Sequence, residues 1–134
     1  MSRGIRNCNP GNIRHSRVFY RGEVQPSQDA DFKQFESMAW GYRAMFILLD
    51  TYRVRYGLDT LRGMISRYAP PSENHTEAYI ASIVEWTGLT PDEPLDTRSR
   101  RVMVPIVMAM SRIENGTPAR CTEVEEGFDL TGWE

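Results

Sequence analysis

The chain has 134 residues, of which 40% are hydrophobic and 25% are charged, so it is long enough for one domain with its own core and needs no disulfide framework. Its formal net charge of −2 argues against general nucleic-acid binding, and two cysteines, Cys8 and Cys121, are too few for a zinc site. Because no apolar run follows the N-terminal arginines, we expect no secretory signal peptide.

The first predicted element is a tight turn. Asn9-Pro10-Gly11-Asn12 places Pro and Gly at the two central positions, which predicts a type II turn with positive φ at Gly11. The following residues, 12–24, are rich in β-branched and aromatic side chains, and residues 31–35 can return as a second strand. Residues 1–36 are therefore predicted to form a small, irregular β-hairpin region.

Residues 38–56 are predicted to form the central helix of the fold. Apolar side chains cover most of its circumference, and a helix of this kind is normally buried on nearly all sides. Ser37 can cap its N-terminus and Gly57 can end it in the left-handed conformation. The four charged residues inside the segment argue against a membrane span.

Two shorter helices should follow. The first, 61–68, can be capped by Asp59 or Thr60 and is stopped by the prolines at 70 and 71. The second begins after Asn74, which together with Glu77 resembles a capping box, and it closes at Gly88.

The last long helix is predicted from Thr97 to about Glu114, with Asp96 as its cap and a bend or restart at Pro105. Beyond it, Thr122 and Glu125 indicate one capped turn before a frayed, acidic tail. The fold class is then α+β and mainly α, in a single domain with a hairpin region (1–36), a helical core (37–116) and a C-terminal tail (117–134).

Elimination leaves carboxylate chemistry as the most promising catalytic option. The chain has no phosphate-binding glycine loop, and its two histidines, His15 and His75, belong to no ligand-spaced cluster, so we expect no metal and no cofactor. Neither cysteine is accompanied by the base and orienting group that a nucleophile requires.

Glu114 is the first candidate acid, because the negative end of a helix dipole and apolar neighbours both disfavour ionisation, as a general acid requires. A solvated glutamate before a C-cap is the alternative interpretation. Glu73, near a helix N-terminus, would stay ionised, which suits a nucleophile, a base or simply a capping residue. Glu36 and Glu23 are weaker candidates, since nothing local requires a functional role for them.

Several segments together resemble a family of small phage and prophage proteins. They are RGIRNCNPGNIR at the start, Phe32-x-x-Phe35-x-Ser37 leading into Gly41-Tyr42-Arg43-Ala44, Tyr68-Ala69-Pro70-Pro71-x-Glu73-Asn74-x-Thr76-x-x-Tyr79, and Glu114-Asn115-Gly116. The resemblance spans the chain from Arg3 to about Gly116. It is to lysozyme-like, virion-associated lytic proteins, which are often labelled structural proteins.

This resemblance implies a lysozyme-like fold that acts on peptidoglycan. In such folds the helix ending in the catalytic glutamate normally precedes the hairpin, whereas this chain begins at the hairpin. We therefore predict a circular permutation in which the Thr97–Glu114 helix lies beside the Asn9–Asn12 turn, which would also bring Cys8 and Cys121 together. The alternative keeps the hairpin first and makes Glu73 the catalytic group.

The expected function is that of a lytic transglycosylase or muramidase, with Glu114 and Glu73 as catalytic residues. Asn9, Asn12 and Asn74 are predicted to bind sugar amides, and Tyr68, Tyr79 and Trp40 to offer stacking surfaces.

We expect a monomer that binds glycan strands and other virion proteins, without binding nucleic acid or inserting stably into a membrane. The resemblance also implies synthesis in the host cytoplasm and either virion association or release to the periplasm. A non-catalytic virion structural or wall-binding protein is the alternative. A nucleic-acid binder that uses the arginine-rich start is a more distant one.

Overall fold

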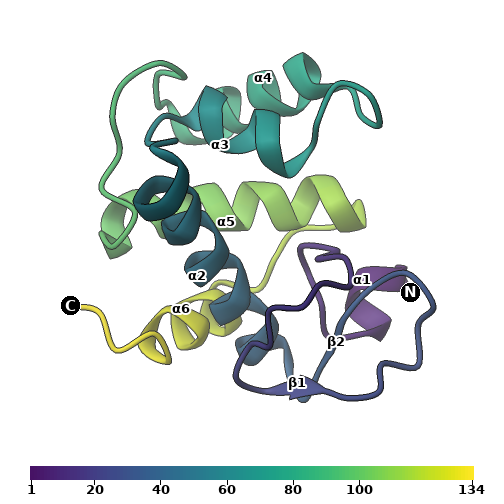
Figure 1. Cartoon of the computed structure of the whole chain (residues 1–134). Coiled ribbons are helices and arrows are strands. Elements are labelled where there is room, and N and C mark those ends of the chain that lie inside the picture. The colour runs from purple at the N-terminus through teal and green to yellow at the C-terminus, as the bar shows by residue number, and fades with distance from the viewer.

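The computed structural model describes residues 1–134, and the chain folds around the helix α2 (Met38–Tyr56) (Figure 1). The Ser37 side chain accepts a hydrogen bond from the Trp40 backbone N–H, and Gly57 ends the helix with φ 67°. Both caps and both bounds match the sequence prediction. Tyr42, Phe46 and Leu49 of this helix are almost completely buried, which confirms its place in the core.

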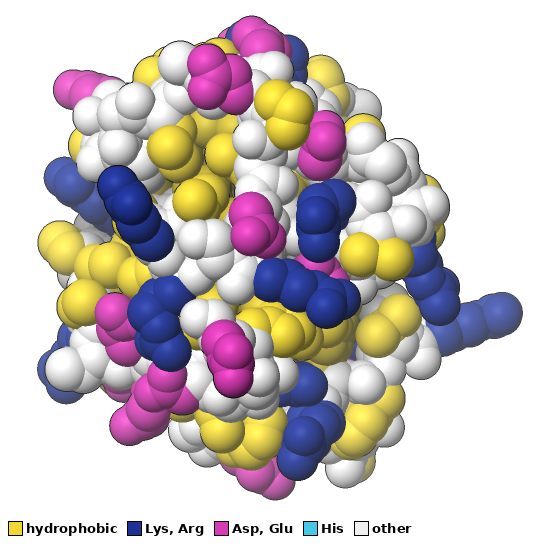
Figure 2. Space-filling view, turned by 90° about the vertical axis from the view of Figure 1, so that its left-hand side faces the viewer, with side chains coloured by type: hydrophobic (Ala, Val, Ile, Leu, Met, Phe, Trp, Pro, Cys, Tyr) yellow, Lys and Arg dark blue, Asp and Glu magenta, His cyan; other side chains and the backbone are white.

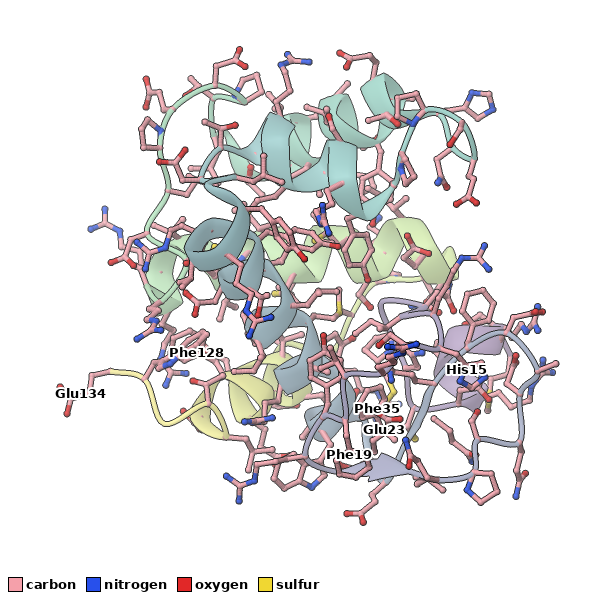
Figure 3. All side chains as sticks on the ribbon, in the orientation of Figure 1. His15, Phe19, Glu23, Phe35, Phe128 and Glu134 are labelled. Carbon is pink, nitrogen blue, oxygen red and sulfur yellow. The ribbon has the colours of Figure 1, made fainter.

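The C-terminal segment is a core helix, α6 (Cys121–Asp129), which packs along α2. Val124 and Phe128 are fully buried, and the Phe128 and Phe46 rings meet edge to face with their centroids 5.1 Å apart. Figure 3 labels Phe128 on α6. The prediction of a frayed tail after one capped turn is therefore wrong. The two apolar residues stand four positions apart on one face of the helix, while the acidic residues that suggested a tail lie among them in the sequence.

Two short helices form the layer at the top of Figure 1, α3 (Leu61–Tyr68) and α4 (Thr76–Thr87). Thr60 caps α3 by accepting from the Gly63 N–H, as one of the two predicted caps. The predicted capping box of α4 is wrong, because His75 precedes the helix without a side-chain cap. The Glu77 carboxylate instead pairs with Arg62 at 2.8 Å.

The long helix α5 (Arg100–Asn115) lies behind α2 in Figure 1. It begins later than predicted, since Ser99 caps it and Asp96 instead accepts a hydrogen bond from the Arg98 N–H in the turn before it. Pro105 lies inside one continuous helix, on its exposed side, so the helix does not restart there. Gly116 ends it in the left-handed conformation, as expected.

The N-terminal region contains the predicted hairpin in a reduced form. The strands β1 (Glu23–Val24) and β2 (Gln34–Phe35) pair antiparallel, with Glu23 opposite Phe35. A short helix, α1 (Arg3–Arg6), precedes them and was not predicted. The protein is thus mainly helical with one small antiparallel hairpin, as the sequence indicated.

The turn at residues 9–12 forms, but not as type II. The Asn12 N–H donates to the Asn9 carbonyl at 3.0 Å, whereas positive φ occurs at Asn12 (49°) and not at Gly11. Gly11 is required for a different reason: a Cβ atom there would collide with the Tyr68 hydroxyl and lie 2.9 Å from the Met45 side chain.

A buried ion pair supports the hairpin region. The Lys33 ammonium donates to the Glu23 carboxylate at 3.1 and 3.3 Å and to the Val18 carbonyl at 2.8 Å, and both charged side chains are almost fully buried. Glu23 also accepts from the Tyr20 N–H. The pair therefore fixes the loop that contains residues 16–21, close to the labelled Glu23 and Phe35 in Figure 3.

The surface shown in Figure 2 carries basic and acidic side chains interspersed with hydrophobic ones. None of the helices combines the length and the apolar character that a membrane crossing would need.

Candidate functional site

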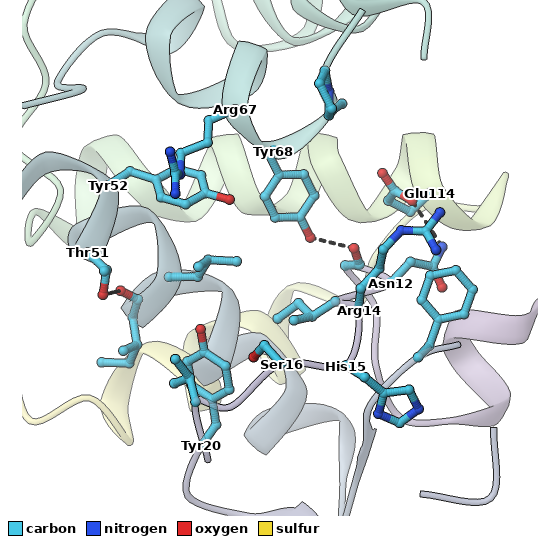
Figure 4. A pocket seen from close by; sticks show the side chains of 18 of the residues that line it. Asn12, Arg14, His15, Ser16, Tyr20, Thr51, Tyr52, Arg67, Tyr68 and Glu114 are labelled. Carbon is cyan, nitrogen blue, oxygen red and sulfur yellow. Dashed lines mark hydrogen bonds between the residues drawn. The ribbon is translucent and has the colours of Figure 1, made fainter. Parts of the chain in front are cut away.

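A cleft of about 830 Å³ lies between the N-terminal loop and the helices (Figure 4). One face of α2 forms its floor, and the chain from Gly11 to Arg21 forms one wall. The end of α3 and the loop that follows it, up to Asn74, form the opposite wall. Glu114, at the C-terminal end of α5, closes one end of the cleft, which places a carboxyl group against the space where a ligand would lie.

Two side chains hold the Glu114 carboxyl group in place. The Asn12 amide donates to Oε1 at 3.0 Å and the Tyr79 hydroxyl donates to Oε2 at 3.0 Å. Both hydrogen bonds favour the ionised form, but burial has the larger effect and raises the pKa of Glu114 above its ordinary value. The group therefore combines a fixed orientation with an increased tendency to keep its proton.

The residue after Glu114 attaches α5 to the N-terminal turn. The Asn115 amide donates to the Pro10 carbonyl at 2.9 Å, and its oxygen accepts from the Ser2 hydroxyl at 2.7 Å. Together with the contact between Asn12 and Glu114, these bonds confirm that the end of α5 lies beside the Asn9–Asn12 turn, as the permutation hypothesis required.

Tyr79 and Tyr68 have different positions relative to the cleft. Tyr79 is buried outside the cleft lining, and burial raises its pKa well above the ordinary value, so its hydroxyl remains a proton donor to Glu114. The Tyr68 side chain lines the cleft, and its hydroxyl donates to the Gly11 carbonyl (Figure 4). Of these two tyrosines, only Tyr68 is placed to offer its ring to a ligand.

The three asparagines predicted to bind sugar are also separated by the structure. Asn9 is fully buried and bonds to the backbone of Ile13 and Lys33, which makes it a support of the turn and removes it from the cleft. Asn12 lines the cleft, whereas Asn74 and Glu73 stand exposed at its rim. Trp40, the third predicted stacking residue, lies outside the lining.

Asn12 itself is in an unusual state. Its backbone adopts the left-handed conformation, which asparagine tolerates better than most residues, and its Oδ1 atom is buried without a hydrogen-bond partner. Unsatisfied buried polar atoms and uncommon backbone conformations are concentrated at functional sites. The Asn12 amide nitrogen thus donates to Glu114 while the amide oxygen stays buried without a donor.

The two cysteines are free thiols. Burial raises the pKa of Cys8, and the nearby charge of Glu123, close to Cys121 in sequence, contributes to the shift. That Cys8 and Cys121 lie close together stays a prediction.

The sequence analysis did not place any arginine in the site, although five line the cleft: Arg14, Arg21, Arg43, Arg55 and Arg67. Two of them, Arg43 and Arg55, are among the four charged residues that argued against a membrane span. Their spacing on α2 could not show that one face of a buried helix remains open to a cleft.

The fold and the site together define a class of protein. It is mainly helical, of the α+β type, and holds a desolvated glutamate at the end of a cleft. The chain is 35% identical over 132 residues to Protein P5 of Pseudoalteromonas phage PM2, and the match covers 96% of this chain and 81% of that protein. No family model matches the sequence. The chain belongs to the family of this phage protein.

Proposed function

We propose that the protein cleaves the glycan strand of bacterial peptidoglycan, with Glu114 as the general acid. The observation that carries this proposal is the state of Glu114: it stands in a cleft, it is oriented by Asn12 and Tyr79, and burial raises its pKa. A general acid that works near neutral pH needs such a raised pKa, because it must hold its proton until the reaction begins.

The reaction that fits one such carboxyl group is lytic transglycosylation. Glu114 gives its proton to the glycosidic oxygen as the bond from that oxygen to the sugar C1 breaks. The resulting carboxylate takes the proton of the 6-hydroxyl of the same sugar, whose oxygen closes an anhydro ring on C1. The proton is thereby returned to Glu114, and no water is consumed.

Glu73 offers the second carboxylate that a hydrolytic reaction would need. It lines the cleft from the loop between α3 and α4 and is exposed to solvent. As a base it would activate a water molecule, and as a nucleophile it would form a glycosyl intermediate. A dependence of the reaction on Glu73 would therefore favour a muramidase over a transglycosylase.

The phage relative supports a role at the host cell wall, since a phage must pass that wall during infection and release. The resemblance to virion-associated lytic proteins supports the same substrate and a lysozyme-like fold. The contacts of Glu114 and Asn115 with the Asn9–Asn12 turn support the permuted order. On this proposal the protein travels with the virion or reaches the periplasm when the cell lyses.

The proposal is tested by adding purified protein to outer-membrane-permeabilised Gram-negative cells and following the loss of turbidity. We expect the wild type to clear the suspension, Glu114→Gln to abolish clearing, and Glu73→Gln to retain it if the reaction is transglycosylation. Circular dichroism of each variant controls for folding. Clearing by a folded Glu114→Gln variant would exclude Glu114 as the acid. A folded wild type that binds cell walls without clearing them would instead favour a structural, wall-binding role.

A further inference from the structure

We propose that the arginine-lined part of the cleft binds the carboxylates of the acidic peptides attached to the glycan, and that Arg67 is the main contact. This inference rests on the proposed function, because it names the part of the peptidoglycan that the same cleft would recognise.

The cleft is strongly basic in a protein that is not. Five of the 16 basic residues of the chain line it, but only two of the 18 acidic residues, Glu114 and Glu73, do so. The molecule as a whole carries a formal charge of −2, and the face in Figure 2 mixes both signs. The positive charge is therefore concentrated where a ligand would bind, which attracts an anion.

None of the five cleft arginines forms an ion pair. Every ion pair of the molecule uses a basic residue outside the cleft; these residues are Arg3, Lys33, Arg53, Arg62, Arg98 and Arg100. Several of those residues each hold two carboxylates. The cleft arginines thus have no carboxylate partner within the protein, although Arg43 donates a hydrogen bond to the Leu130 carbonyl at 3.2 Å. Their positive charge is therefore available to an external acid.

Arg67 is the arginine that is best prepared for such a contact. Its guanidinium carbon lies 3.7 Å from the centroid of the Tyr56 ring and 5.4 Å from that of Tyr52, both on the floor of the cleft. A guanidinium group that lies over an aromatic ring keeps the N–H donors at its edge available for a carboxylate. Figure 4 shows Arg67 lying against Tyr52, above the open part of the cleft. The side chain makes no hydrogen bond within the protein, so a carboxylate can take two parallel bonds from it.

A second pair of arginines strengthens the same conclusion. Arg21 and Arg43 both approach the Trp40 ring, at 5.7 and 5.8 Å, so two like charges lie close together. Burial and the charge of Arg21 both lower the pKa of Arg43. A bound carboxylate would relieve this repulsion, which no carboxylate of the protein relieves.

Peptide carboxylates explain this arrangement better than the sugars do. Neutral sugar rings offer hydroxyl and amide groups, for which Tyr68, Asn12 and Asn74 are suited, but they give five unpaired arginines nothing to bind. The peptides that substitute the glycan carry free carboxylates at a short distance from the strand. Because Glu114 and the arginines share one continuous cleft, a strand next to Glu114 would bring these carboxylates to Arg67.

The test measures binding of the catalytically disabled Glu114→Gln protein to purified, insoluble peptidoglycan by co-sedimentation. Two forms of the wall are compared: native sacculi, and sacculi whose carboxyl groups have been coupled to methylamine and so made neutral. Arg67→Gln is introduced in the same background. Arg101→Gln serves as the matched control, because Arg101 is exposed, unpaired and outside the cleft. Single-stranded DNA is added as a competitor in a parallel series.

We expect Arg67→Gln to weaken binding to native sacculi about tenfold, as the loss of a charge-assisted hydrogen-bonded pair does. Amidated sacculi should bind the parent protein about as weakly, and Arg67→Gln should cause no further loss there. Arg101→Gln should change neither value by more than about twofold, as is usual for surface charges. Equal losses for Arg67→Gln on both forms of the wall would overturn the inference. So would equal effects of the two arginine changes, or DNA that displaces the wall at equimolar amounts.

The outcome is separable from that of the proposed function. Wild-type protein that releases fragments equally from native and amidated sacculi would refute the peptide contact and leave the glycosidase intact. Carboxylate-dependent binding through Arg67, with no fragments released by the wild type, would support the peptide contact and refute the glycosidase.

Discussion

The buried ion pair between Glu23 and Lys33 allows a direct test of what stabilises the loop of residues 16–21 in the cleft wall. Glu23 accepts hydrogen bonds from three donors, the Tyr20 N–H, the Gln25 amide and the Lys33 ammonium, at 3.0 to 3.3 Å. Glu23→Gln keeps the volume of the side chain but leaves one acceptor oxygen for these donors. It also leaves the Lys33 charge buried without its counter-ion.

Removal of one partner from a buried ion pair costs about 3–5 kcal/mol, against a total free energy of unfolding of about 5–15 kcal/mol for a domain of this kind. For an unfolding slope of about 2 kcal/mol per molar urea, this predicts a fall of about 2 M in the urea midpoint. The free energy of unfolding is measured by urea titration with circular dichroism for four proteins: wild type, Glu23→Gln, Lys33→Met, and the double variant.

The double variant distinguishes this reasoning from a general sensitivity of the region. It buries no unpaired charge, so its loss of stability should be at least about 2 kcal/mol smaller than the sum of the two single losses. Single losses that add to within about 0.5 kcal/mol would refute the coupling. Because the pair also holds the Val18 carbonyl, Glu23→Gln should weaken substrate binding by the adjoining loop.

Three further changes test other parts of the structure. Phe128→Ala, which removes a fully buried ring from α6, should lower the free energy of unfolding by about 3–5 kcal/mol in urea titration, and a loss below about 1 kcal/mol would contradict the packing of α6 on α2. Gly11→Ala should cost about 1–3 kcal/mol in the same measurement, because the new methyl group overlaps the Tyr68 hydroxyl and Met45; an unchanged midpoint would show that this contact is loose. Glu114→Gln should stabilise the protein at pH 7 to 8. The folded pKa of Glu114 is raised above its ordinary value of 4.5, so the native state binds more protons than the unfolded state and wild-type stability falls as the pH rises from 4.5 through the folded pKa. Urea titrations between pH 4 and 8 should show the advantage of the glutamine disappear toward pH 4.5, and a constant or reversed difference would contradict the burial of Glu114.

Local chemistry explains why much of the fold could be predicted. Ser37, Gly57, Gly88 and Gly116 act on residues within one helical turn, and each begins or ends a helix as its side chain or its backbone freedom dictates. The same local reasoning failed for α6, because its stability comes from Phe128 packing on Phe46, far away in the sequence.

In the site, too, the features that depend on neighbouring residues in the sequence could be predicted, and those that depend on tertiary contacts could not. The position of Glu114 at a helix end follows from the residues around it, and the position was predicted. Its orientation depends on Asn12 and Tyr79, which reach it from other elements, and both had been expected to bind sugar. The pairing of Glu23 with Lys33 and the opening of one face of α2 to the arginine-lined cleft also arise only from tertiary contacts.

Mass spectrometry of the soluble products from purified peptidoglycan tests the central claim most directly. The account predicts that the wild type releases glycan fragments with anhydro ends and that Glu114→Gln, folded and at equal concentration, releases none. Fragments of the same kind from the glutamine variant would contradict the assignment of Glu114, and sacculi left intact by the folded wild type would contradict the proposed glycosidase itself.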